Sequence, residues 1–132
     1  MLVAFDPGGT TGVAVTGYET FTVTTPQDIP VVLDQYCPDT VIYEEFKAIV
    51  IDKHGLYTIR LVGWIEAACY DRNIPTVLQH PQERKLFLAP ARRLLAIRKH
   101  VIHEVDALAH LLCYEDRVAR GVLDKIGSRS HV

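Results

Sequence analysis

The sequence begins Met1-Leu-Val-Ala-Phe-Asp-Pro-Gly-Gly-Thr-Thr-Gly-Val-Ala-Val-Thr-Gly17. An apolar run leads into one acid, Asp6, and a Pro-Gly-Gly turn then precedes a second apolar run. This pattern predicts a β-hairpin with strands at residues 2–5 and 11–16. The hairpin holds a carboxylate at the end of a rigid strand, beside glycine backbone that takes up little space. Such an arrangement suits a bound metal ion or a phosphate group.

The remaining elements alternate between helix and strand. Residues 18–25 alternate β-branched and aromatic side chains, which predicts a third antiparallel strand. Apolar residues at near-helical spacing predict a long helix over residues 52–73 and a second strong helix over residues 103–121. The other expected elements are a helix at 29–36, strands at 40–46 and 74–78, and a basic, short-helical segment at 81–100. The order βββαβαβα predicts an α/β fold, a mixed five-stranded sheet with helices on both faces.

Length and composition fit one domain, residues 1–132. Hydrophobic residues make up 48% of the chain, which favours a packed core over disorder. The formal net charge of -2 excludes polyanion binding through bulk charge alone, so such binding needs a local basic patch. Three cysteines without a C-x-x-C pair predict reduced, partly buried thiols in a cytosolic protein. The start lacks a basic n-region and no apolar run approaches ~18 residues, so we expect neither a signal peptide nor a membrane partner.

Three acidic positions stand out because of their context. Asp6 ends the first strand, Glu44 and Glu45 end an otherwise apolar strand, and Asp106 lies near the start of the last helix. A carboxylate at the end of a buried strand is costly unless positive charge compensates it, and converging carboxylates repel one another. A hard divalent cation resolves both problems. We therefore expect a hard divalent cation, for which Mg²⁺ is suited, and two such ions can promote hydrolysis of a phosphodiester.

Two histidines share a helix face with the last of these acids. His103 precedes Asp106 by three residues and His110 follows it by four, so all three lie along one side of the predicted helix. His103 is therefore a candidate to join the metal site. His110 lies a turn further along the helix and is the weaker candidate.

Each acid also has an ordinary structural interpretation. Asp6 suits a D-P-G-G turn, in which its carboxylate accepts backbone N–H bonds. One of Glu44 and Glu45 is expected to be a solvated strand end. Asp106 is favoured near a helix N-terminus by the helix dipole. The combination favours a metal site: two strand-end acids, then an acid three residues after a histidine, along a βββαβαβα chain.

Three segments resemble the metal-binding stretches of the RuvC-like Holliday junction resolvases, which belong to the ribonuclease H-like nuclease superfamily. The segments are Val3-Ala-Phe-Asp-Pro-Gly-Gly-Thr-Thr-Gly-Val-Ala14, Val41-Ile-Tyr-Glu-Glu-Phe46 and His103-Glu-Val-Asp-Ala-Leu-Ala-His110. The compact chain resembles the RuvC-like proteins of bacteriophages more than the longer bacterial enzymes. The resemblance covers nearly the whole chain in its order of elements, and the motifs within it are short.

The resemblance implies a metal-dependent, structure-selective endodeoxyribonuclease that resolves four-way (Holliday) or other branched DNA junctions. It implies that Asp6 bridges two Mg²⁺ or Mn²⁺ ions, that Glu44 and Asp106 are further ligands, and that His103 ligates a metal or handles protons. Strand alternation lets only one of Glu44 and Glu45 point into the site, and the motif selects Glu44. It also implies products with a 5′-phosphate and a 3′-hydroxyl, a role in DNA recombination and repair, and no organic cofactor. The expected location is the cytoplasm, that of the host for a viral protein.

The segment between the last strand and the last helix is strongly basic. Six cations and no acid lie within residues 84–99: Arg84, Lys85, Arg92, Arg93, Arg98 and Lys99. We expect these residues to contact DNA phosphates beside the acidic site without selecting a sequence. The ordinary interpretation is a solvated amphipathic helix.

Two large apolar side chains on the long helix, Leu56 and Trp64, are candidates for contacts with a second copy of the chain. A homodimer with two-fold symmetry would match the symmetry of a four-way junction, and the family resemblance points the same way. For Trp64, a core contact between helix and sheet is an equally good interpretation.

Other functions fit parts of the sequence. The segment Phe5-Asp-Pro-Gly-Gly-Thr-Thr-Gly12 also resembles the first phosphate loop of the actin and sugar-kinase ATPases, but these proteins need two such domains and a second glycine-rich loop. A catalytically inactive nucleic-acid-binding domain would gain nothing from clustered carboxylates near phosphates. Another ribonuclease H-like nuclease, acting on flaps or RNA–DNA hybrids, would use the same acids.

Overall fold

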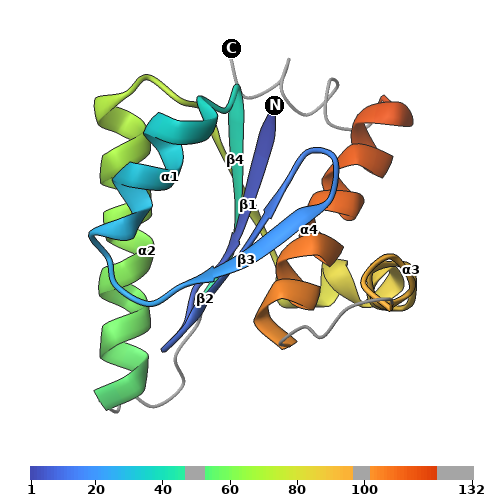
Figure 1. Ribbon diagram of the computed structural model, residues 1–132, viewed down its shortest axis with the longest axis horizontal. Coiled ribbons are helices and arrows are strands. Elements are labelled where there is room, and N and C mark those ends of the chain that lie inside the picture. The colour runs from blue at the N-terminus through green and yellow to red at the C-terminus, as the bar shows by residue number, and fades with distance from the viewer. Residues whose placement is uncertain (47–52, 97–101, 122–132) are drawn as a thin grey trace.

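The protein, described by a computed structural model over residues 1–46, 53–96 and 102–121, is built on a five-stranded sheet (Figure 1). The strands lie in the order β3-β2-β1-β4-β5. Their bounds are β1 (Leu2–Asp6), β2 (Thr11–Val15), β3 (Glu19–Val23), β4 (Thr40–Glu44) and β5 (Thr76–Gln79). β2 is antiparallel to both β1 and β3, whereas β4 is parallel to both β1 and β5. The sheet is therefore mixed, as the sequence predicts, and β1 is its central strand.

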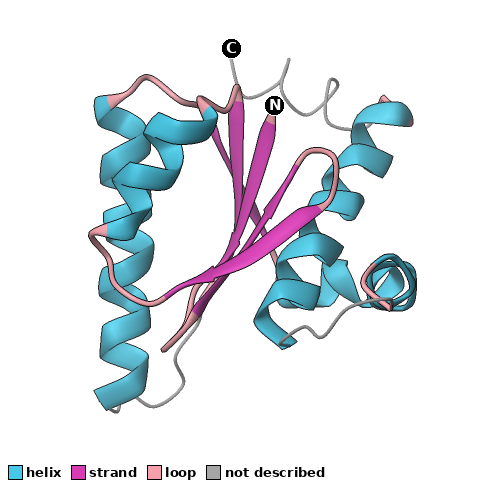
Figure 2. Cartoon of the chain, in the orientation of Figure 1, coloured by secondary structure: helices cyan, strands magenta, loops and turns pink. Residues whose placement is uncertain are grey.

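Helices cover both faces of this sheet (Figure 2). On one face lie α1 (Asp28–Tyr36) and α2 (Lys53–Asp71), and on the other lie α3 (Leu88–Leu94) and α4 (Ile102–Ala119). A 3₁₀ helix, η1 (Pro81–Phe87), follows β5 and packs against α4. The predicted α/β fold with helices on both faces is confirmed.

Strand alternation divides the central strands between two cores. Val3 and Phe5 belong to the core beneath α1 and α2, whereas Ala4 belongs to the core beneath α4. Because successive side chains of a strand point to opposite faces, Asp6 lies on the α4 face, two residues after Ala4. Glu44 follows Ile42 of the same core in the same way. The pleat of the sheet therefore directs both strand-end acids toward α4.

A glycine lets α4 approach the sheet closely. Gly12 of β2 lies opposite Asp6 in the β1–β2 register. A Cβ atom built on Gly12 would lie 2.0 Å from the carbonyl oxygen of His103, which is far inside van der Waals contact. Only glycine fits at this position, and its missing side chain allows the first turn of α4 to rest over the end of β1.

The structure shows which apolar residues of the long helix pack against the sheet. Leu61 and Ile65 are buried against the sheet, but Leu56, Ile59 and Trp64 are 41%, 40% and 45% exposed. A helix that packs on the outside of a sheet buries only one stripe, so apolar residues off that stripe remain on the surface. The core interpretation of Trp64 is therefore wrong.

Two smaller predictions can also be compared with the structure. β5 begins and ends later than the predicted strand at 74–78, because residues 74 and 75 lie in the connection from α2. Cys69 and Cys113 are buried, Cys37 is exposed, and all three are free thiols, as predicted. Within the described ranges, no helix is both long enough and apolar enough to cross a membrane.

Candidate active site

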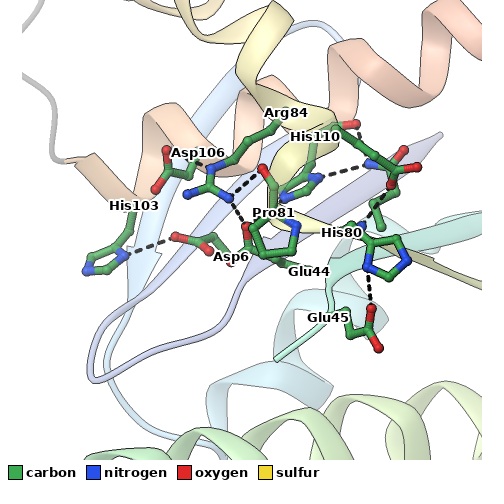
Figure 3. Close-up of polar contacts among 11 residues, drawn as sticks. Asp6, Glu44, Glu45, His80, Pro81, Arg84, His103, Asp106 and His110 are labelled. Atoms are coloured by element: carbon green, nitrogen blue, oxygen red, sulfur yellow. Dashed lines mark hydrogen bonds and ion pairs between the residues drawn. The ribbon is translucent and has the colours of Figure 1, made fainter. Parts of the chain in front are cut away.

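The parallel pairing of β1 and β4 brings two acids to the same edge of the sheet. Asp6 is the last residue of β1 and Glu44 the last residue of β4. Asp6 is 4% exposed, and the Glu44 side chain is 17% exposed. The carboxylate of Glu45 pairs elsewhere, with its Oε2 atom 2.5 Å from Nδ1 of His80 (Figure 3). Of the two glutamates, Glu44 is the one that joins Asp6.

The first turns of α4 add a histidine and a third acid (Figure 3). Nδ1 of His103 lies 3.0 Å from Oδ2 of Asp6. Asp106 follows on the same side of α4, near enough for its negative charge to act on Asp6. The structure thus gathers the four expected site residues, Asp6, Glu44, His103 and Asp106, from β1, β4 and α4.

A cation lies among these acids. Arg84 of η1 donates to Oε1 of Glu44 and, at 2.8 Å, to the carbonyl oxygen of Pro81. Its Nε atom lies 3.4 Å from Oδ1 of Asp106. The sequence placed Arg84 in a stretch that contacts DNA, but here its guanidinium contacts two of the three acids.

Of the other five cations of the basic stretch, the structure describes three. Lys85 of η1 and Arg92 and Arg93 of α3 are exposed. These residues are on the side of the sheet that carries α4, where the acids also lie. Arg98 and Lys99 lie outside the described residues.

His110, which the sequence left as the weaker candidate, is completely buried and contacts an acid. Its Nε2 atom lies 3.1 Å from Oε1 of Glu44, and its Nδ1 atom lies 3.0 Å from Nε2 of Gln79. Gln79 is the last residue of β5 and is paired with Glu44 in the β4–β5 register. No sequence pattern marked Gln79 as a site residue. Its signal was a polar residue that follows a short apolar strand, next in space to the strand that ends in Glu44.

The two strand-end acids differ in proton affinity. Burial raises the pKa of Asp6 to about 7, and the hydrogen bond with His103 only partly offsets this, while the charges of Glu44 and Asp106 raise the pKa further. Burial also acts to raise the pKa of Glu44. The hydrogen bond from His110 and the positive charge of Arg84 outweigh that effect, so the pKa of Glu44 lies below its usual value. The negative charge around Asp6 is therefore not fully compensated by the protein.

This donor set fits a hard divalent cation, because three carboxylates and an imidazole converge on one edge and one carboxylate lacks sufficient positive charge. As the side chains of the described residues are placed, no three metal-binding groups stand close enough together to hold an ion. The acids instead contact His103, His110 and Arg84. Asp6, Glu44 and Asp106, with His103, are the residues that could hold a divalent cation after a rearrangement of their side chains.

Comparison with known proteins identifies the fold. No protein-family model and no curated protein matches the sequence. RuvC of Thermus thermophilus in complex with a Holliday junction substrate is similar in structure, with a TM-score of 0.73 and 19% sequence identity over 92% of this chain and 96% of that chain. The fold is that of the RuvC resolvases. A second structure of Thermus thermophilus RuvC has a TM-score of 0.70 and 18% identity over the same shares of the two chains.

A viral resolvase is similar in structure as well. The Fowlpox virus resolvase, in complex with Holliday junction DNA, has a TM-score of 0.60 and 12% identity over 86% of this chain and 97% of that chain. The mixed sheet and its two helical layers are thus those of the ribonuclease H-like fold that the sequence resemblance predicts. At such low identities the likeness shows the fold, and the roles of single residues rest on the geometry of this chain.

Proposed function

We propose that this protein is a metal-dependent endonuclease that resolves four-way DNA junctions. The observation that carries the proposal is the convergence of Asp6, Glu44 and Asp106 on a RuvC-like fold. Two of the similar structures were determined with Holliday junction DNA bound, which supports branched DNA as the substrate class.

The chemistry follows from the acids and their partners. Bound Mg²⁺ or Mn²⁺ would supply the Lewis acidity that activates water and stabilises the leaving oxygen of a phosphodiester. Asp6 and Glu44, fixed at the ends of adjacent strands, supply ligands on a rigid part of the fold. His103 holds Asp6 through Nδ1 and is also available to accept or donate a proton near the scissile bond. We propose products with a 5′-phosphate and a 3′-hydroxyl.

Substrate binding requires positive charge close to the acidic edge. We propose that Lys85, Arg92 and Arg93, which are exposed on η1 and α3, contact the DNA backbone. Contacts with phosphates position the nucleic acid without selecting its sequence. Arg84, which also belongs to η1, contacts Glu44 and Asp106. Its side chain therefore brings positive charge from the same basic segment directly to the acids.

We also propose that the working form is a homodimer of single-domain subunits, one for each half of a two-fold symmetric junction. Leu56, Ile59 and Trp64 are exposed apolar side chains of α2, on the helical layer opposite the acids, and are the residues proposed to contact a second copy. Sedimentation velocity checks this proposal, because a mass that stays near 14.8 kDa at micromolar concentration would contradict it.

The substitution Asp6→Asn tests the proposed function. It removes one negative charge from the metal site but keeps nearly the same shape, so we expect cleavage of a labelled four-way junction to be abolished in Mg²⁺ and Mn²⁺. Junction binding in Ca²⁺ should remain close to that of the wild-type protein. Asp71→Asn, an exposed acid at the end of α2, is the matched control and should cut at the wild-type rate. Wild-type cleavage by Asp6→Asn would refute the site.

A substrate panel then separates related activities. Labelled four-way junction, flap, duplex and RNA–DNA hybrid substrates are incubated with the wild-type protein and with Asp6→Asn. Preferential, symmetric cutting of the junction is the expected result. A preference for flap or hybrid would leave the metal site in place but overturn junction resolution.

A further inference from the structure

We propose that Gln79 and His110 act as a pair of positioning residues for Glu44, and that His110 donates a hydrogen bond to Glu44 and is not itself a metal ligand. The proposal deepens the proposed function and rests on the metal site assumed there. It concerns three side chains from β4, β5 and α4, and Gln79 lies outside the three segments that resemble nuclease motifs.

The orientation of the Gln79 amide is fixed by the backbone of α4. The Nε2 atom of Gln79 lies 3.0 Å from the carbonyl oxygen of His110, and a carbonyl oxygen can only accept a hydrogen bond. Turning the amide over would place its oxygen against this second oxygen, without a proton between them. The nitrogen of Gln79 therefore faces His110, and its two hydrogens are available for two acceptors.

The same nitrogen determines the tautomer of His110. Nε2 of Gln79 also lies 3.0 Å from Nδ1 of the imidazole, and since it can only donate, Nδ1 must accept. A neutral imidazole whose Nδ1 accepts carries its proton on Nε2. That Nε2–H group lies 3.1 Å from Oε1 of Glu44, within hydrogen-bond distance.

Both ring nitrogens of His110 are thus engaged, and neither has a lone pair directed at the acids. The ring is completely buried, as is Gln79, so water does not compete for these contacts. The bond to Oε1 fixes the carboxylate of Glu44 against α4. Hydrogen bonds of this kind to a ligating carboxylate orient it, and their loss typically costs roughly 10–100-fold in metal affinity.

Two substitutions at His110 separate positioning from ligation. His110→Gln places an amide NH₂ near the position of Nε2 and retains the donor, whereas His110→Leu fills the space without a donor. We would measure Mn²⁺ affinity by isothermal titration calorimetry, without DNA, for the wild-type protein and both variants. His110→Gln should bind within about threefold of the wild-type protein, and His110→Leu should bind roughly 10–100-fold more weakly.

Gln79→Met tests the other member of the pair, because methionine has a similar shape and no donor. This variant should also bind Mn²⁺ more weakly, while thermal unfolding shows that it is folded. Equal loss of affinity in His110→Gln and His110→Leu would make His110 a ligand and overturn the proposal. Wild-type affinity in both His110→Leu and Gln79→Met would leave the pair with a structural role only, and would overturn it as well.

A spectroscopic measurement keeps the test independent of variant folding and of the metal. Long-range ¹H–¹⁵N correlation spectra of the metal-free wild-type protein should show a protonated Nε2 and an unprotonated Nδ1 for His110. The proton should stay on Nε2 when Mg²⁺ is added. A proton on Nδ1 or its loss from Nε2 on addition of Mg²⁺ would overturn the inference. If the wild-type protein binds no Mn²⁺, the proposed metal site fails, and the spectrum still decides the tautomer.

Discussion

Asp6 is an acid that the metal-free protein holds at a cost. Its pKa is raised from 3.8 to about 7, chiefly by burial, so the folded state binds a proton that the unfolded chain releases. The free energy of unfolding therefore falls as the pH rises between these two values, and it stays lower above the second. Functional acids commonly carry such a cost, because their environment is arranged for a ligand or a reaction.

Because the free energy of unfolding of the wild-type protein falls as the pH rises, the stability of Asp6→Asn relative to it should depend on pH. Asparagine cannot ionise, so without metal the variant should be more stable than the wild-type protein at about pH 8, and the two should converge at about pH 4. Urea denaturation in EDTA at several pH values measures the difference. A difference in the free energy of unfolding between Asp6→Asn and the wild-type protein that is the same at all pH values would contradict the prediction.

Single residues show where prediction from the sequence succeeds and where it stops. Asp6 and Glu44 could be predicted because each ends an apolar run, so that the strand itself dictates its place. Arg84 and Gln79 could not be placed, since their partners are distant in sequence and only the packing of η1 and β5 against α4 brings them together. A basic stretch looks alike in sequence whether its arginines face solvent or carboxylates.

At the scale of elements, the contact between β2 and α4 places His103 and Asp106, two of the four site residues, beside the end of β1. Gly12 permits this contact, because the carbonyl oxygen of His103 occupies the space that any side chain at residue 12 would need. The first turn of α4 also carries Glu104, whose carboxylate accepts hydrogen bonds from Thr20 and Thr22 of β3. The N-terminal end of α4 is thus held to the sheet at two places.

Gly12→Ala should therefore displace α4 and lower both stability and cleavage. Forcing a methyl group into a filled space typically costs about 1–3 kcal/mol, and the movement would carry His103 and Asp106 away from Asp6. Gly9→Ala in the same hairpin is the control, because a Cβ there meets no atom within 4 Å. Urea denaturation and junction cleavage measure the two effects. Equal behaviour of the two alanine variants would show that the close approach is unimportant.

The 3₁₀ helix η1 contributes through Arg84, whose guanidinium neutralises acids that a metal ion would also neutralise. Arg84→Gln should consequently bind Mn²⁺ more tightly, by roughly tenfold, which corresponds to about 1.4 kcal/mol. Lys85→Gln removes the same charge from an exposed neighbour and should change the affinity little. Calorimetry without DNA compares them. Weaker binding by Arg84→Gln would mean that the arginine supports the metal site and does not compete with it.

The elements themselves were largely predictable, for a physical reason. Four strands of the sheet contain short apolar runs, β3 alternates β-branched and aromatic side chains, and α2 and α4 carry enough apolar residues at helical spacing to be recognised. The face of α2 was not predictable, because Leu56 and Ile59 are apolar yet lie off the stripe that packs on the sheet. The number of apolar residues exceeds what one face of a helix can bury, and the sequence does not say which remain outside.

At the scale of the whole molecule, the acidic site and a group of exposed cations share one side of the sheet. The acids and the exposed cations Lys85, Arg92 and Arg93 lie on the side of α3 and α4, whereas α2 on the other side presents both apolar and charged residues. A chain with a net charge of -2 can then attract a polyanion locally without being basic overall. Under the proposed function, DNA would contact the side of α3 and α4, and the layer with α2 would be available to a second subunit.

The salt dependence of DNA binding tests whether DNA contacts the side of α3 and α4 and not the side of α2. Each phosphate contact that is lost should reduce the slope of log Kobs against log salt concentration by about 0.9, so the double variant Arg92→Gln, Arg93→Gln should lower the slope by about 1 to 2. Arg60→Gln removes an exposed cation from α2, on the opposite layer, and should leave the slope unchanged. Fluorescence anisotropy with a labelled junction in Ca²⁺ measures the slopes. The slope is the decisive quantity, because affinity alone also falls when a variant is partly unfolded. An equal decrease in slope for Arg60→Gln would mean that DNA phosphates contact the α2 side as much as the α3 and α4 side.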